Sequence, residues 1–368
     1  MKVPLFKRGI WKKIAVALAI AITTGFTLIG IVWYTFFYIP NPKEIVHFES
    51  LGDTLEGTLY YPNDKNERYP AVILLHGSGK EKQNSPGFQN VAKAFVKGGF
   101  AVLVYDKRGV GKSGGTFKNH DFKKFIHDIY QAIDFLKVNP RINSEAIGLM
   151  TNSQSGFFAP ELASNRPELA FIYNRVGPVV DFTTLTLYQL KLRMEQVHEN
   201  SKAIDKIMSV EEDLIDYYKS AAERSENYNN DKEIIEEKMT LMWESYGPNV
   251  PFGQQLYPSS YDQESIDRIA YYYSYDPRVY FERDFDTPLY YSYAEKDINV
   301  PTVLCIEELK KIIAEGRHQI EYKVWPGVGH NMIKVYYAFS GVYPPGFLKE
   351  MVRWASEKTD LKIHTPSG

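Results

Sequence analysis

Apolar residues follow two patterns along most of the chain. Some form short continuous runs, and others recur every three or four positions in longer, partly charged segments. A continuous run is typical of a strand buried on both faces of a sheet, whereas the longer spacing predicts an amphipathic helix. Strands that alternate with helices form right-handed βαβ units, so we expect a mostly parallel sheet flanked by helices. Strands are predicted at 71–75, 100–105, 146–150, 169–173, 288–294 and 319–325, and helices at 88–97, 120–138, 154–165, 303–315 and 345–356.

Two regions depart from this alternation. Residues 45–50 and 54–61 are predicted as an antiparallel pair of strands, because Leu51-Gly52-Asp53 supplies a turn between them. Residues 182–246 contain charged amphipathic segments without a convincing strand, and Pro- and Tyr-rich loops are predicted from there to Pro277. The sequence therefore predicts a mainly helical insertion. The expected domain divisions are a core at 45–180, the insertion at 181–277, a second part of the core at 278–358, and a tail at 359–368.

The N-terminal segment is long and apolar enough to cross a membrane. Residues 14–39 carry no charge, and a span of about 26 residues exceeds the roughly 20 that a transmembrane helix needs. A cleaved signal peptide is the alternative, but its apolar region is shorter and ends at an A-x-A-like site, which is missing here. We expect an uncleaved, single-pass signal anchor, with segment 1–13 in the cytoplasm and the chain after Pro40 outside it. The supporting residues are the cations Lys2, Lys7, Arg8, Lys12 and Lys13, and the interfacial aromatics Trp11, Trp33, Tyr34 and Tyr38.

Charge and cysteine content exclude several classes of function and of site. The formal net charge is −2 and the basic residues are spread along all 368 positions, so no nucleic-acid footprint is present. Cys305 is the single cysteine, which excludes an intramolecular disulfide and a cysteine-based metal site.

The stretch from Ala146 to Gly156 has the layout of a nucleophile elbow. A predicted strand ends at Met150, Ser153 follows among small residues, and a helix is predicted next. The G-x-S-x-G pattern would place glycine at 151 and 155, where this chain has Thr151 and Ser155. Ser153 is the expected nucleophile. The alternatives are that Ser153 only caps the helix, or that Ser155 is the nucleophile.

A nucleophilic serine needs a base, and the base needs an orienting carboxylate. Asp297 and His330 each follow a predicted strand, and His330 lies in a glycine-containing loop. Because functional groups of parallel α/β sheets gather at the carboxyl ends of the strands, we expect Ser153, Asp297 and His330 to meet there. Glu295 is the alternative acid.

Two loops are expected to frame this site. His76-Gly77-Ser78-Gly79 follows a strand, and the backbone N–H groups of Gly77 and Ser78 could join that of Gln154 as an oxyanion hole. Asp106 and Arg108 follow the next strand and are predicted as a structural pair that holds a loop, and His76 is given a structural role beside the site. Residues 109–114 also match G-x-G-x-x-G, but no helix opens at those glycines. A dinucleotide or phosphate loop is therefore not expected.

From about residue 45 onward the chain resembles α/β hydrolases, and within them the esterase and peptidase-like branch that includes dienelactone hydrolases and prolyl-oligopeptidase catalytic domains. The resemblance rests on H-G-S-G at 76–79, D-K-R-G-V-G-K-S at 106–113, the elbow, D-x-x-V-P at 297–301 and G-H at 329–330. It implies an α/β-hydrolase fold with Ser153 as nucleophile, His330 as base and then acid, and Asp297 as the residue that orients it. It also implies that the insertion caps the substrate pocket.

The expected function is a membrane-anchored serine hydrolase that cleaves a small ester substrate, with neither a metal nor an organic cofactor. Acyl transfer or peptide hydrolysis by the same triad, and a catalytically silent binding or scaffold module, are the alternatives. The insertion has two interpretations. It could be a solvated helical hairpin that packs on the core, or its apolar residues could line a pocket, namely Phe182, Leu185, Leu187, Met194 and Met208.

Overall fold

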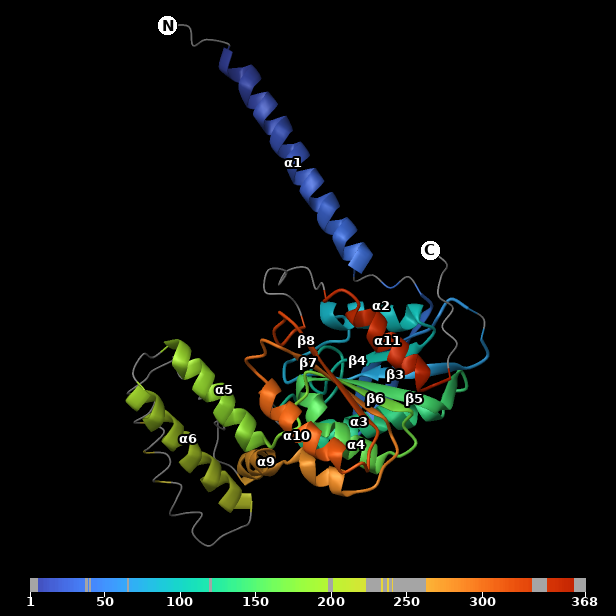
Figure 1. Cartoon of the computed structure of the whole chain (residues 1–368). Helices are drawn as coiled ribbons and strands as arrows, with labels where there is room; N and C mark the ends of the chain where they lie inside the picture. Colours follow the sequence, from blue (N-terminus) through green and yellow to red (C-terminus); the bar gives the residue numbers. More distant parts are fainter. Residues whose placement is uncertain are drawn as a thin grey trace.

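One eight-stranded sheet forms the centre of the protein (Figure 1). In the computed structural model the described residues are 6–36, 39, 41–64, 66–118, 121–197, 201–222, 233, 237, 240, 263–332 and 343–360. The strand order is β1-β2-β4-β3-β5-β6-β7-β8. β1 pairs antiparallel with β2 and β2 pairs antiparallel with β4, whereas all other pairs are parallel. The strands are β1 (Lys43–Ser50), β2 (Asp53–Tyr60), β3 (Tyr69–Leu74), β4 (Ala101–Tyr105), β5 (Ile142–Asn152), β6 (Phe171–Arg175), β7 (Leu289–Ala294) and β8 (Ile320–Trp325).

The sequence pattern of each strand matches its place in the sheet. Every residue of β3 and β4 is buried, because these central strands have helices on both faces. β1 forms one edge, and its side chains alternate: Val46 and Phe48 are buried, whereas His47 and Glu49 are exposed. The predicted hairpin and the mostly parallel sheet are both confirmed.

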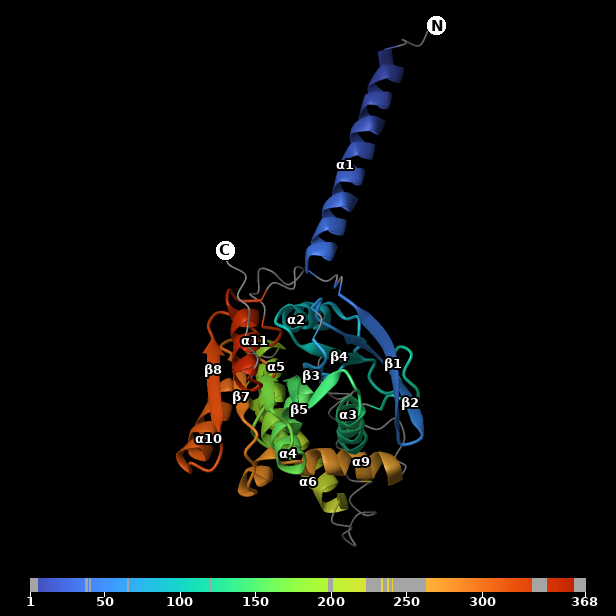
Figure 2. The same ribbon diagram turned by 90° about the vertical axis from the view of Figure 1, so that its right-hand side faces the viewer.

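Helices cover both faces of the sheet (Figure 2). α2 (Pro86–Lys97) and α11 (Phe347–Glu357) pack on one face. α3 (Phe122–Lys137), α4 (Ala159–Asn165) and α10 (Thr302–Ala314) pack on the other. The Asp121 side chain accepts a hydrogen bond from the N–H of Lys124 and so sets the start of α3. The predicted first residue, His120, lies outside the described residues.

The segment after β5 differs from the single helix predicted at 154–165. A 3₁₀ turn, η1 (Ser153–Phe158), comes first, and α4 begins only at Ala159. Pro160 stands in the first turn of α4, where its missing N–H costs nothing; further inside one continuous helix it would remove a hydrogen bond. The prediction of one regular helix was therefore wrong.

Within the described residues the insertion contains only helical elements: α5 (Phe182–Val197), α6 (Ser201–Ala222) and α9 (Gln263–Ser274). The prediction of loops up to Pro277 was wrong for α9. The consecutive tyrosines of α9 do not form a clear helical repeat of apolar positions in the sequence. In the structure Tyr272 packs on Phe122 and Phe182 of the main core. Most of residues 223–262 lies outside the described part.

The apolar residues of the insertion pack the hairpin. Phe182 and Leu185 are buried in the main core. Met194 of α5 is fully buried against Ile207 of α6. Phe182 and Leu185 therefore pack on the core, whereas Met194 packs between the two helices of the hairpin.

The first helix, α1 (Phe6–Phe36), stands away from the rest of the protein (Figures 1 and 2). Its segment Trp11–Ile31 is long and apolar enough to cross a membrane, and no part of its most apolar stretch is buried. The described part of the helix runs to Phe36, and Ile39 has no helical assignment. The side chains of Trp33 and Tyr34, and all of Tyr38, lie outside what the structure describes.

Cys305 is fully buried on α10. Burial raises the pKa of its thiol to about 12. The thiol is therefore protonated at neutral pH and screened from solvent.

Candidate active site

Three side chains that follow three different strands meet at the carboxyl edge of the sheet. Ser153 follows β5, Asp297 follows β7 and His330 follows β8. The Ser153 hydroxyl lies 2.8 Å from Nε2 of His330. On the other side of the ring, Nδ1–H donates to the Asp297 carboxylate, at 3.0 Å from Oδ1 and 2.9 Å from Oδ2. A carboxylate on Nδ1 fixes the tautomer that leaves Nε2 free to accept the serine proton.

The backbone at Ser153 is strained. Its φ is +51°, in the left-handed region that side-chain-bearing residues adopt at a cost. The glycine that this turn needs lies at 156, one position later than the G-x-S-x-G pattern places it. A Cβ on Gly156 would lie less than 3.0 Å from the Cα of Gly177, so the two backbones touch. The elbow thus obtains its close packing from a shifted glycine.

Ser155 and Thr151, which replace the two glycines of the G-x-S-x-G pattern, are both buried, and Ser155 also forms hydrogen bonds within the turn. The Ser155 hydroxyl accepts from the N–H of Asn152 at 2.8 Å and bonds its carbonyl at 3.2 Å. Ser155 is only 3% exposed and bridges the turn, and the hydroxyl that contacts His330 is that of Ser153. Thr151 is fully buried in β5, and its hydroxyl has no hydrogen-bond partner among the described residues.

The loop that carries Asp297 is held from two sides. Its Oδ1 also accepts from the N–H groups of Asn299 and Val300, at 2.8 and 2.9 Å. From the insertion, the Tyr188 hydroxyl donates to the Asp297 carbonyl at 3.1 Å, and the Gln189 amide donates to the Asn299 carbonyl. Helix α5 therefore contacts the carboxylate loop directly.

Glu295, the alternative acid, has a different partner. Its carboxylate accepts from the N–H of Gly327 at 2.7 Å. It holds the turn after β8, and the carboxylate on His330 belongs to Asp297.

The predicted oxyanion donors are not equivalent. The N–H of Gly77 donates to the carboxylate of Glu81. In contrast, the N–H of Ser78 has no acceptor among the described residues. Gln154 is the second residue of η1, where a helical N–H has no partner within its own helix. Of the three predicted donors, Ser78 and Gln154 are therefore the ones that lack an acceptor among the described residues.

His76 is buried beside the site and bonds to backbone. Its Nε2–H donates to the Tyr105 carbonyl at 2.7 Å. Burial, with a smaller effect from the charge of Lys107, lowers the pKa of His76 to about 3. The ring is therefore neutral and joins the strand ends of β3 and β4.

Asp106 and Arg108 are each bonded to other groups and not to one another, so their prediction as a pair was wrong. Asp106 accepts from the N–H groups of Gln83 and Lys112, at 2.8 and 2.9 Å. Arg108 donates to Asp128, with Nε 3.0 Å from Oδ2, and its other end contacts Asp53 and Ser50. Each still holds the loop after β4.

Sequence reasoning missed Lys107, which lies between these two residues. It is 3% exposed, and its Nζ donates to the Gly77 carbonyl at 2.7 Å and to Oε1 of Gln154 at 3.0 Å. The sequence feature that could have indicated it is a lysine directly after a buried strand, because a buried lysine is rare unless its ammonium has partners.

Comparison with known proteins agrees with this fold. Residues 66–245 match the family model described as serine aminopeptidase, S33. The Pyrococcus furiosus esterase Pf2001 superposes with a TM-score of 0.54 at 15% identity, covering 88% of this chain and 94% of that one. DcsB in complex with its substrate analogue gives a TM-score of 0.53 at 17% identity, covering 87% and 99%. The protein has the α/β-hydrolase fold.

The chain also has similar sequences among curated proteins. The thiohydrolase aneE of Aspergillus aculeatus is 36% identical over 133 residues, which are 36% of this chain and 40% of the relative. The polyketide transferase grgF of a Penicillium species is 33% identical over 110 residues, which are 29% of this chain and 36% of the relative. The match thus spans at most about two fifths of these relatives.

Proposed function

We propose that this protein is a membrane-anchored serine hydrolase that cleaves carboxylic esters through an acyl-enzyme. The observation that carries the proposal is the chain of contacts from Ser153 through His330 to Asp297. The relatives named thiohydrolase and polyketide transferase also support acyl chemistry at this site.

Each residue has a defined part in the proposed reaction. Ser153 Oγ attacks the ester carbonyl while Nε2 of His330 takes its proton. The N–H groups of Ser78 and Gln154 stabilise the resulting oxyanion. His330 then protonates the leaving alcohol, and Asp297 stabilises the imidazolium. Water, activated by His330, releases the acid and restores the Ser153 hydroxyl.

A fluorophosphonate probe tests the nucleophile. We expect the detergent-solubilised wild type to be labelled and Ser153→Ala not to be labelled. Ser155→Ala is the matched control, since it removes a neighbouring hydroxyl that serves the turn, and it should retain labelling. If the folded wild type is not labelled by the probe, the result would contradict the proposal and favour a silent binding module. Labelling that depends on Ser155 alone would reassign the nucleophile.

Acyl transfer is a second candidate, favoured by the relative named polyketide transferase. Both reactions share the acyl-enzyme and differ only in the group that attacks it. Incubation with a model ester plus an added alcohol separates them. Transfer predicts a new ester as the main product, whereas hydrolysis predicts mainly the free acid at every alcohol concentration.

For the membrane we propose that α1 is an uncleaved anchor with its N-terminus in the cytoplasm. The cations before the apolar span support this orientation, because positive residues remain on the cytoplasmic side. Protease added to intact cells should then remove the domain beyond Pro40. Full protection of that domain, with cleavage only after lysis, would contradict the orientation.

A further inference from the structure

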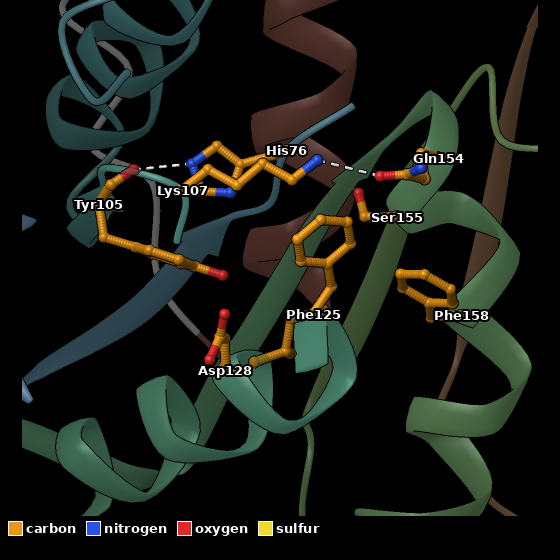
Figure 3. A pocket seen from close by; sticks show the side chains of 9 residues that line it. His76, Tyr105, Lys107, Phe125, Asp128, Gln154, Ser155 and Phe158 are labelled. Carbon is orange, nitrogen blue, oxygen red and sulfur yellow. Dashed lines mark hydrogen bonds between the residues drawn. The ribbon is translucent and has the colours of Figure 1, made fainter. Parts of the chain in front are cut away.

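Lys107 connects the two segments that carry the available oxyanion donors. It follows β4 and extends toward Gln154, as the dashed line in Figure 3 shows. Its ammonium bonds the Gly77 carbonyl at 2.7 Å and Gln154 Oε1 at 3.0 Å. The same ammonium lies 4.1 Å from the centre of the Phe125 ring, within the range of a cation–π contact. One buried cation thus bonds both sides of the proposed oxyanion site.

The contact with Gly77 determines where the N–H of Ser78 points. The Gly77 carbonyl and the Ser78 N–H belong to one peptide unit, and the chain contains no cis peptide bond among its described residues. In a planar trans unit the carbonyl and the N–H point in opposite directions. Because Lys107 holds the carbonyl inward, the N–H faces away from Lys107. A hydrogen bond on the carbonyl also polarises the unit and strengthens its N–H as a donor.

We propose that Lys107 is a positioning residue of the oxyanion hole: by bonding the Gly77 carbonyl and the Gln154 side chain, it aims and polarises the N–H of Ser78. This inference rests on the proposed function. The role is distinct from that of a catalytic residue, because Lys107 acts through the Gly77–Ser78 peptide and does not contact the reacting atoms.

The surroundings of Lys107 favour such a use over simple stabilisation. Among the described residues no carboxylate lies within ion-pair distance of its ammonium. Asp128 faces the same small cavity of about 20 Å³, but it is bonded to Arg108. Burying a cation that has only neutral acceptors is unfavourable for stability, and this indicates that Lys107 has a functional role.

The charge of Lys107 is also sensitive to pH near neutrality. Burial lowers the pKa of Lys107 to about 7, against the smaller opposing effects of Glu81 and Asp128. The other titratable groups that face it are neutral across this range, because burial lowers the pKa of His76 and raises that of Tyr105. Polarisation of the Ser78 N–H should therefore weaken as the pH rises through 7.

Two substitutions separate the donor from the charge. Lys107→Met removes both, whereas Lys107→Gln keeps an N–H donor without the charge. Loss of one oxyanion donor lowers kcat by about 10²–10³-fold in serine hydrolases, so we expect a loss of about 10²-fold for Lys107→Met and a smaller loss for Lys107→Gln. KM should change little. Lys112→Met is the matched control, because Lys112 lies in the same loop with a side chain that is 74% exposed.

The measurements use full-length protein in detergent, with an activated ester as substrate and a trifluoromethyl ketone as the oxyanion-forming inhibitor. We expect both Lys107 variants to lose inhibitor affinity in step with kcat, and the basic limb of the wild-type kcat profile to disappear in Lys107→Gln. Wild-type kcat and inhibitor affinity in both variants, or a change confined to KM, would overturn the inference. If Lys107→Met fails to fold, Lys107→Gln and the wild-type pH profile decide. An inactive, unlabelled wild type would instead count against the hydrolase proposal itself.

Discussion

Gly156→Ala tests whether the shifted glycine controls the elbow. The added Cβ would lie less than 3.0 Å from Gly177 Cα and from Asn174 Oδ1, whereas ordinary contacts begin at 3.4 Å. Neither neighbour is the end of a flexible chain, because Gly177 offers only backbone and Asn174 is buried and bonded to the Gly156 carbonyl. Overpacking of this kind costs about 1–3 kcal/mol of stability. Displacing the turn by about 1 Å lowers kcat by about 10²-fold, because Ser153 leaves its alignment with His330.

The control for this substitution is Gly87→Ala. Gly87 lies in the first turn of α2, and the nearest atom to an added Cβ is the Tyr343 hydroxyl at 4.0 Å. Removing a helical glycine stabilises by about 0.5–1 kcal/mol, so Gly87→Ala should raise Tm slightly and leave kcat unchanged. Thermal unfolding and ester hydrolysis are measured on both variants in the same detergent. A Gly156→Ala protein with wild-type Tm and kcat would refute the argument.

Four further predictions follow from the contacts of single residues. Asp297→Asn should lower kcat by about 10⁴-fold with little change in Tm, because His330 loses the tautomer that accepts the serine proton; an unchanged kcat would exclude Asp297 from the triad. Tyr188→Phe should cost about 1 kcal/mol in urea unfolding and lower kcat severalfold, since the insertion loses its bond to the Asp297 loop. Arg108→Met should cost about 3–5 kcal/mol, because Asp128 remains buried without its cation, and adding Asp128→Leu should restore part of that loss. Between pH 7 and about 10 the unfolded chain binds more protons at Lys107 than the folded one, so the wild type should gain stability relative to Lys107→Met as the pH rises, and a parallel pair of urea midpoints would contradict this.

The core of the fold could be predicted because its strands are apolar without interruption. β3 and β4 are buried along their whole length, and no amphipathic alternative competes for such runs. Helix α9 could not be predicted in the same way. Its sequence Tyr271-Tyr272-Tyr273 lacks a clear 3.6-residue period, and the helix is stabilised by packing on Phe122 and Phe182. Tertiary contacts of this kind leave no local pattern.

The candidate site divides in a similar way. Ser153, Asp297 and His330 could be predicted to meet because each follows a strand, and parallel strands bring their carboxyl ends to one edge. Side-chain contacts across loops escaped prediction. Nothing in the sequence indicates that Glu81 accepts from the Gly77 N–H, or that Lys107 turns inward while Lys112 remains exposed. These arrangements depend on how three loops fold against each other.

The burial of Cys305 makes the native protein behave as if it had no cysteine. A protonated, fully buried thiol reacts poorly with maleimides and other alkylating agents. A cysteine introduced at an exposed position is then the single reactive group of the folded chain, with no need for a cysteine-free background. Placed at Leu51 in the β1–β2 turn, such a reporter would be modified by a membrane-impermeant maleimide on intact cells if the proposed orientation holds. The same handle would accept a fluorophore or a spin label for following the domain at the membrane surface.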